Sequence, residues 1–368
     1  MPKPTVILGM SGGVDSSVAA SYLLNEGYDV HGITLKTWED EDDTTQTSKR
    51  WQERGCCKVG MAKYVAKLLD ISHEVIDIRE MFTKEVIDDF VAGYLQGITP
   101  NPCVRCNERV KVLVLHKIAM ERGANFFATG HYAQITQEES PKLLKGKDGR
   151  KDQSYFLYRL SPTWLSHMLL PLGGMEKSEV WQRAEAMGLP TDELKESQEI
   201  CFVTRGNYRT FLTEHAPHAS RPGPFLDAQG QKVGEHRGIA FYTPGQRKGL
   251  GLATGDRLYV QTVIPDTHTV VLGPKEGLLK NECLVADLNI FDEHQLQDGN
   301  PIDVKFRYAS PSVPAHLHWK DQREIQVQFD TPQQALSPGQ SMVFYRNDQV
   351  LGGGLIQRFP LDTIEHLN

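Results

Sequence analysis

Short apolar runs alternate with amphipathic stretches up to about residue 200 of the chain. The apolar runs predict strands at 6–8, 30–35, 73–77 and 126–130. The amphipathic stretches predict helices at 61–69, 84–94, 108–121 and 178–187, the last of which should begin at an N-cap on Ser178 and end at Gly188. Strands that alternate with helices in this way are typical of a doubly wound parallel sheet, so this half predicts an α/β domain.

The pattern changes from about Tyr208, where a Pro- and Gly-rich segment leads into short strands and turns. From about residue 281 the alternation is strict, and the apolar side chains at the even positions of 302–308 share one predicted face. This alternation is typical of a small antiparallel β-barrel. We therefore expect three domains: an α/β domain at 1–207, a small central domain at 208–280 and a C-terminal β-barrel at 281–368.

Composition and charge narrow the function classes. The chain has 368 residues and a formal net charge of −7, which argues against a protein coated in basic surface, although Lys and Arg outnumber Asp and Glu between 101 and 123. No apolar run approaches the length that spans a membrane, and the first predicted strand follows Met1 so closely that no signal peptide fits. A cytoplasmic protein without a membrane partner is expected. The six cysteines are too few for a scaffold built on disulfide bonds.

The sequence Ser11-Gly12-Gly13-Val14-Asp15-Ser16 links the first predicted strand to a predicted helix. Its glycines let the backbone approach an anion, its serines add hydroxyl donors, and the N-terminus of the helix favours negative charge. The loop has neither the lysine of a Walker loop nor the glycine spacing of a dinucleotide fingerprint. It is therefore a candidate phosphate site, and the alternative is a plain Gly-rich turn in a parallel sheet.

A second informative segment, residues 99–107, holds a C-x-x-C in a Pro-stiffened loop just before a predicted helix. With Asn107 as N-cap, the positive end of that helix and the nearby arginines would favour the reactive thiolate at Cys106. Half a zinc site and a merely structural pair are the alternatives, but no second C-x-x-C exists and the adjacent Cys56 and Cys57 have poor ligand spacing. Taken alone, Cys201 would be a small buried apolar residue.

Taken together, several long motifs resemble the bacterial tRNA-specific 2-thiouridylases, and they occur in the same order. They lie at 9–16, 99–111, 128–132, 151–156, 200–202 and 245–251, and the likeness reaches 337–340. The resemblance implies a sulfurtransferase that replaces the C2 oxygen of the wobble uridine in tRNA by sulfur and cleaves ATP, with Mg²⁺, to AMP and pyrophosphate. It also implies a fold of the adenine nucleotide alpha hydrolase type for the first domain.

The resemblance carries site roles to matching positions. It makes Cys106 the nucleophile and Cys201 the persulfide carrier, with a transient Cys106–Cys201 disulfide. The implied ATP contacts are Gly9, Met10, Ser11, Gly12, Gly13, Val14, Asp15, Ser16, Leu35 and Gly130. The implied contacts to the target base are Asn101, Pro102 and Cys103, and those to tRNA are His131, Lys151, Asp152, Gln153, Arg307, Tyr308 and Gln340.

The same resemblance implies partners for the protein. It leaves open alternatives for the cysteine chemistry and for the function. The expected partners are the tRNAs for Lys, Glu and Gln and a persulfide donor such as a cysteine desulfurase or a sulfur-relay protein. Because some family members have Asp in place of Cys103, a minority hypothesis is an iron–sulfur cluster on Cys103, Cys106 and Cys201. The competing functions are an amide-forming or other ATP pyrophosphatase and a non-enzymatic module that binds RNA or a nucleotide.

Overall fold

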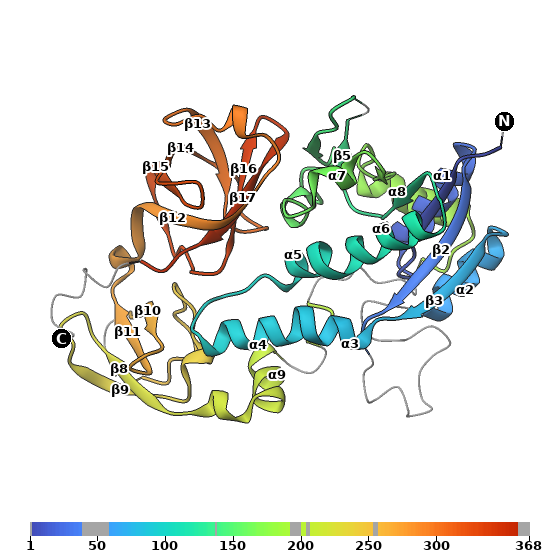
Figure 1. Ribbon diagram of the computed structural model, residues 1–368. Helices are drawn as coiled ribbons and strands as arrows, with labels where there is room; N and C mark the ends of the chain where they lie inside the picture. The colour runs from blue at the N-terminus through green and yellow to red at the C-terminus, as the bar shows by residue number, and fades with distance from the viewer. Residues whose placement is uncertain are drawn as a thin grey trace. The chain divides into compact units, whose positions relative to one another are not determined.

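The computed structural model describes residues 2–38, 59–136, 138–191, 200–203, 207–252 and 257–359 (Figure 1). The chain divides into two compact units, one made of residues 1–86, 103–204 and 348–350, the other of residues 87–102, 205–347 and 351–368. Cys56 and Cys57 lie outside the described residues. The expected domain boundaries at 207 and 280 stay predictions.

The core of the first unit is a parallel sheet in the order β3-β2-β1-β4-β7, which confirms the predicted α/β class. Its strands are β1 (Thr5–Gly9), β2 (Asp29–Lys36), β3 (Ser72–Asp77), β4 (Phe126–Ala128) and β7 (Met168–Leu169). The central strand β1 is apolar on both faces: Val6 and Leu8 are buried on one face and Ile7 on the other, as helices on both sides of a parallel sheet require. A hairpin of β5 (Ala133–Ile135) and β6 (Leu143–Lys145) is added to this unit.

Helices α1 (Val14–Asn25), α2 (Val59–Leu68) and α8 (Lys177–Ala186) belong to the same unit, together with the short α3 (Arg79–Phe82) and α7 (Pro162–Leu165). The predicted N-cap on Ser178 is wrong. The helix begins one residue earlier, because Glu176 is the N-cap and forms a reciprocal capping box with Glu179.

The helix that follows the C-x-x-C also begins earlier than predicted. It starts as α5 (Pro102–Cys106), passes through a π-helical turn (Asn107–Lys111) and continues as α6 (Val112–Glu121). Proline is well suited to a first helical position, where its missing N–H costs nothing. Asn107 therefore does not cap the helix, and the C-x-x-C lies within the first helical turns instead of a preceding loop. A second π-helical turn (Thr83–Ile87) connects α3 to α4 (Asp88–Leu95).

The second unit carries a small central sheet in the order β10-β11-β8-β9. Its strands are β8 (Gly223–Leu226), β9 (Lys232–His236), β10 (Tyr259–Ile264) and β11 (Thr269–Gly273). Helix α9 (Tyr208–His215) packs on α4, where the rings of Tyr94 and Tyr208 stack with centroids 4.9 Å apart.

The C-terminal part of the second unit is an antiparallel β-barrel, as predicted, in the order β12-β15-β14-β13-β16-β17, closed by pairing of β12 with β17. The strands are β12 (Leu279–Ile290), β13 (Pro301–Lys305), β14 (Val313–Trp319), β15 (Ile325–Gln334), β16 (Ser341–Arg346) and β17 (Gln349–Ile356). The alternation ends sooner than expected: β13 stops at Lys305, and Tyr308 is 37% exposed instead of facing the core. In the described parts of the chain, no helix is long and apolar enough to cross a bilayer.

Candidate active site

The loop between β1 and α1 is a tight turn fixed by its own serines. Gly12 has a φ of +76°, which glycine adopts without strain. The Gly13 carbonyl oxygen accepts hydrogen bonds from Ser16 Oγ at 3.1 Å and from Ser17 Oγ at 3.0 Å. Gly13 is also the N-cap of α1. Because glycine has no side chain to accept hydrogen bonds from the first turn, the N–H groups of this turn can bind an anion.

Strand β2 supports the same loop from the side. Met10 N donates to Ile33 O at 2.8 Å, and Thr34 Oγ1 donates to Met10 O at 2.6 Å. Because the Thr34 hydroxyl donates its hydrogen to Met10, its oxygen accepts from His73 Nε2 at 2.8 Å. Burial, with a smaller contribution from the charge of Lys63, lowers the pKa of His73, so its neutral ring completes this chain. The predicted ATP contact Leu35 is buried on the same strand.

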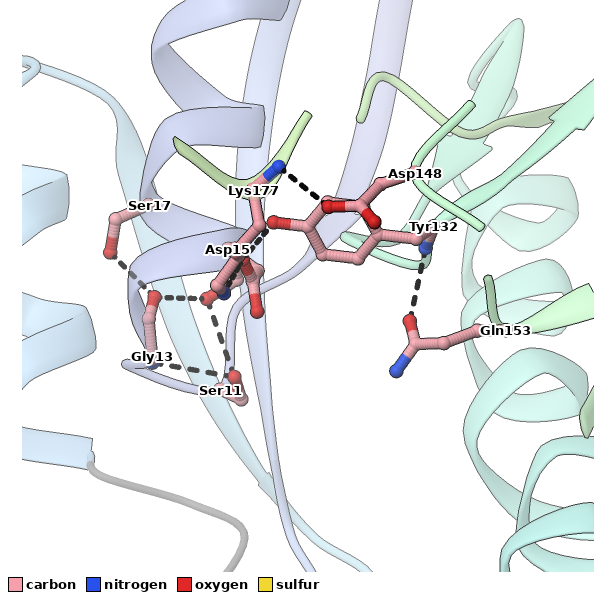
Figure 2. A network of polar contacts seen from close by, with 9 residues as sticks. Ser11, Gly13, Asp15, Ser17, Tyr132, Asp148, Gln153 and Lys177 are labelled. Carbon is pink, nitrogen blue, oxygen red and sulfur yellow. Dashed lines mark hydrogen bonds and ion pairs between the residues drawn. The ribbon is translucent and has the colours of Figure 1, made fainter. Parts of the chain in front are cut away.

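Asp15, in the first turn of α1, is the centre of a polar network (Figure 2). Its Oδ1 accepts a hydrogen bond from Tyr132 OH at 2.6 Å and pairs with Lys177 Nζ at 2.6 Å. The Lys177 side chain is only 9% exposed, and its ammonium nitrogen lies 5.3 Å from the ring centroid of Tyr132 and 5.4 Å from that of Trp181. The loop therefore receives its cation from the first residue of α8.

Sequence reasoning missed Lys177, which is 162 positions from Asp15. One signal was available. A lysine in the first turn of a helix opposes the helix dipole, so its presence there indicates a partner elsewhere in the fold. The backbone N–H of Lys177 also donates to Asp148 Oδ2 at 3.1 Å, which holds the start of α8 on the loop that follows β6.

The segment after β4 approaches α1 closely. A Cβ atom on Gly130 would lie 3.1 Å from both Asp15 C and Ser16 N, so only glycine fits there without displacement. The following His131 has its Nδ1 2.7 Å from Thr129 Oγ1. This places the predicted ATP contact Gly130 beside the loop of residues 9–16.

The predicted tRNA contacts Lys151, Asp152 and Gln153 connect to the same network. Gln153 Oε1 accepts from Tyr132 N at 3.0 Å (Figure 2). Asp152 is 4% exposed, and its Oδ1 accepts from Gly146 N at 2.9 Å and from Ser154 N at 3.0 Å. The Asp152 carboxylate thus shapes this loop.

The thiols named by the sequence all lie in the first unit. Cys106 is buried, Cys103 is exposed, and Cys201 is half-buried in a turn closed by Val203 N donating to Ile200 O at 3.0 Å. Phe202 anchors this turn through a ring contact of 5.8 Å with Phe82. None of these cysteines is in a disulfide bond in the described part of the chain.

A positive cluster surrounds Glu108, two positions after Cys106. Arg159 Nε donates to Glu108 Oε2 at 2.9 Å, and both side chains are about one-tenth exposed. Arg109 Nε lies 3.2 Å from Glu108 Oε1, and Arg105 Nη1 lies 3.5 Å from Oε2. Three guanidinium groups thus share one carboxylate, so this part of the helix keeps positive charge that suits an RNA phosphate.

The described residues contain no group of three His, Cys, Asp or Glu side chains that could hold a metal ion. Cys103, Cys106 and Cys201 are all among the described residues, and an iron–sulfur cluster on them stays a prediction.

Comparisons with known proteins identify the family. Residues 4–205 match the model of the tRNA methyl transferase HUP domain, residues 209–274 that of the tRNA methyl transferase PRC-barrel domain, and residues 280–356 that of the aminomethyltransferase beta-barrel domain. The tRNA-specific 2-thiouridylase of Clostridium perfringens is 41% identical over 363 residues, which are 97% of this chain and 99% of that relative. The chain belongs to the tRNA-specific 2-thiouridylase family.

Further relatives agree with this assignment. The 2-thiouridylase of Heliobacterium modesticaldum is 44% identical over 97% of this chain and 93% of its own length, and that of Moorella thermoacetica is 43% identical over 95% and 99%. As a 2-thiouridylase the chain is a tRNA sulfurtransferase, which sets aside the amide-forming ligase and the non-enzymatic module. The description of the HUP-domain model speaks of methyl transfer, but the relatives that match along nearly their whole length are thiouridylases.

The predicted RNA contacts of this 2-thiouridylase in the second unit differ in their exposure and in their hydrogen bonds. Tyr308 is exposed, and Lys305 Nζ lies 5.6 Å from its ring centroid. Arg307 Nη2 donates to Ala335 O, and Gln340 Nε2 donates to Thr99 O at 2.9 Å. Tyr308 is thus offered as a stacking surface, whereas Arg307 and Gln340 are already bonded within their own unit.

Proposed function

We propose that this 2-thiouridylase activates the wobble uridine of tRNA by adenylation at the C2 oxygen and then replaces that oxygen with persulfide sulfur from Cys201. The C2 carbonyl is flanked by two nitrogens, which makes it a poor electrophile, and oxide is a poor leaving group. Attack of the C2 oxygen on the α-phosphate releases pyrophosphate and converts that oxygen into part of AMP, a good leaving group. ATP is therefore consumed to make the displacement possible.

The sulfur steps balance with the two cysteines. Cys201 carries a terminal persulfide sulfur, which attacks C2 and expels AMP. The Cys106 thiolate attacks Cys201 Sγ, which breaks the bond to the transferred sulfur and leaves a Cys106–Cys201 disulfide. If Cys106 attacks first, hydrosulfide is released and performs the displacement, and the same disulfide results. A thiol reductant and a fresh persulfide donor, a cysteine desulfurase or a sulfur-relay protein, then restore the enzyme.

One observation carries this proposal: the phosphate-binding turn, its Asp15–Lys177 pair and the thiols of Cys106 and Cys201 belong to one compact unit. Residues 9–16, with Leu35 and Gly130, would hold ATP beyond the carboxyl ends of parallel strands, where such ligands bind. Because the described residues offer no three-ligand metal site, Mg²⁺ would be held chiefly by the phosphate oxygens of ATP.

The proposed RNA contacts fall into two groups, those to the target uridine and those to the rest of the tRNA. Asn101, Pro102 and Cys103 would meet the target uridine, which has to leave its stack for C2 to be reached. His131, Lys151, Gln153, Arg307 and Tyr308 would contact the tRNA, and the buried Asp152 would position its neighbours. The tRNAs for Lys, Glu and Gln are the proposed substrates, and the cytoplasm, where they occur, is the proposed location.

Nucleoside and nucleotide analysis of one reaction tests this function. The protein is incubated with ATP, a persulfide donor and an unmodified tRNA transcript, and the tRNA is then digested. We expect 2-thiouridine together with AMP and pyrophosphate. ADP in place of AMP, or a methylated uridine, would contradict the proposal.

A matched cysteine control is available in the barrel. Cys283 is buried there, and burial raises the pKa of its thiol to about 12, so it has no thiolate to contribute. Cys283→Ser should therefore keep thiolation, whereas Cys106→Ser and Cys201→Ser should not.

A further inference from the structure

Two segments of the second unit that are distant in the sequence are joined by hydrogen bonds to the backbone of one residue, Thr99. We call residues 96–102 the target-base segment and residues 335–340, between β15 and β16, the barrel loop. Thr99 N donates to Pro338 O at 2.8 Å, and Gln340 Nε2 donates to Thr99 O at 2.9 Å. Both polar groups of the Thr99 backbone are thus taken up by the barrel loop, just two positions before Asn101.

The barrel loop is rigid enough to act as a support. Gly339 N donates to Ile356 O at 2.8 Å, and Ile356 N donates to Gln340 O at 2.9 Å, which joins the loop to β17. Gly339 has a φ of +83°, and a Cβ atom there would lie 3.0 Å from Ile98 Cβ and 3.2 Å from Thr99 N. The two segments are therefore in close contact as well as hydrogen-bonded.

The opposite end of the barrel loop reaches a predicted RNA contact. Arg307 Nη2 donates to Ala335 O, so the loop begins at one predicted tRNA residue and ends at another, Gln340. The target-base segment has further supports, because Arg358 Nη2 donates to Gln96 O and Thr99 Oγ1 lies 3.5 Å from Thr243 Oγ1. Immediately beyond the segment, α5 begins at Pro102 and leads to Cys106.

We propose that Gln340 is a positioning residue: its side-chain amide holds the Thr99 carbonyl, and the barrel loop thereby sets the place of Asn101 and Pro102 for the target uridine. The family resemblance instead makes Gln340 a direct tRNA contact. This inference rests on the proposed function, which assigns Asn101 and Pro102 to the base. The barrel is then both an RNA-binding surface and the support of the residues that present the base.

The first test measures the free protein. Gln340→Glu keeps the size of the side chain but replaces its N–H donor with an oxygen that faces the Thr99 carbonyl. Amide hydrogen exchange at residues 97–99 and at Asn101, which carry the amide hydrogens of this segment, should become faster by roughly fivefold, the factor that one net hydrogen bond contributes. A residue that only contacts tRNA would leave exchange in the free protein unchanged, and that result would overturn the proposal whatever reaction the enzyme catalyses.

The second test separates binding from chemistry with a wobble-uridine tRNA transcript. Gln340→Glu should lower the single-turnover rate of 2-thiouridine formation at saturating tRNA by about tenfold while the tRNA Kd changes by less than about twofold. A raised Kd with a normal rate at saturation would mean that Gln340 is a direct contact. Gln333→Glu is the matched control, because it adds the same charge nearby and its amide bonds only Thr331 among the described residues, at 2.8 Å to the carbonyl oxygen and 3.3 Å to Oγ1.

Gly339→Ala gives an independent perturbation without a change of charge. Its Cβ atom would push on Ile98 and Thr99, so exchange over residues 97–102 should rise and the single-turnover rate should fall as in Gln340→Glu. If both variants speed exchange but neither slows thiolation at saturating tRNA, the support exists without a role in positioning, and the proposal is wrong. Wild-type protein that makes no 2-thiouridine would instead refute the proposed function, and the exchange result would still stand.

Discussion

The loop of residues 9–16, the proposed phosphate site, and the target-base segment reach their conformations in different ways. In the loop, the turn is built from neighbours, because Ser16 and Ser17 bond Gly13 three and four positions away. In the target-base segment, the Thr99 peptide is held by Gln340, 241 positions later in the chain. Local contacts therefore form the turn of the loop, whereas a long-range contact holds the backbone that would present a base. Substitutions in the two regions, and in the residues that support them, test this difference.

The largest effect is expected from the cysteines. Cys106→Ser and Cys201→Ser should each abolish 2-thiouridine formation, because a hydroxyl neither carries nor releases persulfide sulfur. ATP binding, measured by calorimetry, should stay within about twofold of wild type, since the loop forms its turn without either thiol. Loss of ATP binding in these variants would break the comparison, because the loop would then depend on the cysteine region.

A smaller but clear effect is expected from the long-range ion pair of the loop, between Asp15 and Lys177. Lys177→Met removes the partner of Asp15 and leaves a carboxylate uncompensated beside the bound phosphates. The value of kcat/KM for ATP should fall by about 10- to 100-fold, which corresponds to about 1.5–3 kcal/mol for a charge-assisted hydrogen bond.

Lys147→Met is the matched control for that change. Lys147 Nζ lies 3.4 Å from Glu179 Oε2, and both side chains are about half exposed, so this ion pair contributes little. We expect less than about a twofold change in kcat/KM for ATP. If Lys177→Met behaves in the same way, the loop does not need the cation that the structure supplies.

A moderate effect is expected at Gly130. Gly130→Ala would place a methyl group 3.1 Å from Asp15 C and Ser16 N, so the KM for ATP should rise by about fivefold as the segment moves away from α1. Gly149→Ala is the control, because a Cβ atom there meets nothing within 4 Å. Equal behaviour of the two variants in ATP titrations would show that the close approach at Gly130 has no part in nucleotide binding.

A separate prediction concerns the free energy of unfolding at acid pH instead of catalysis. Burial lowers the pKa of His236 to about 4 from its ordinary 6.5, and its Nδ1 accepts from Gly238 N at 3.1 Å, which requires the neutral ring. As pH falls below 6.5, the unfolded chain takes up this proton before the folded one does. His236 should therefore remove at most about 3 kcal/mol of stability between pH 6.5 and pH 4, with no further loss below that range.

Urea midpoints measured across that pH range check the prediction, with His236→Gln as the non-titrating variant. Glutamine has a hydrogen-bond donor and an acceptor but does not take up a proton in this range. The loss of unfolding free energy on acidification should therefore be smaller in the variant, by the contribution of His236. If the urea midpoint changes with pH by the same amount in both proteins, the pKa of His236 does not differ between the folded and unfolded states.

Elements with strong local signals were predicted well from the sequence, and those set by distant contacts were not. The apolar run of β1 and the Ser11 to Ser16 loop are contiguous, so strand, turn and helix could be predicted in order. Strand β7 has only two residues and no pattern to detect. The start of α5 at Pro102 was missed because the helical pattern is clear only from Glu108 onward.

In the candidate site, too, the contacts between distant residues could not be predicted from the sequence. The resemblance named residues by motif but not their partners, so the buried Asp152 and the bonded Gln340 were expected simply as RNA contacts. Lys177 was missed because no spacing rule connects it to Asp15. These contacts arise only once the sheet, its helices and the barrel have folded.

If ATP activates the C2 oxygen of the wobble uridine, that oxygen must leave with AMP, and isotope transfer detects it. A tRNA transcript whose wobble uridine carries oxygen-18 at C2 is thiolated with ATP and a persulfide donor, and the AMP is analysed by mass spectrometry. We expect the oxygen-18 in the phosphate of AMP, in equal amount to the 2-thiouridine formed. Unlabelled AMP alongside 2-thiouridine would show that ATP is consumed elsewhere, and the adenylation mechanism would be wrong.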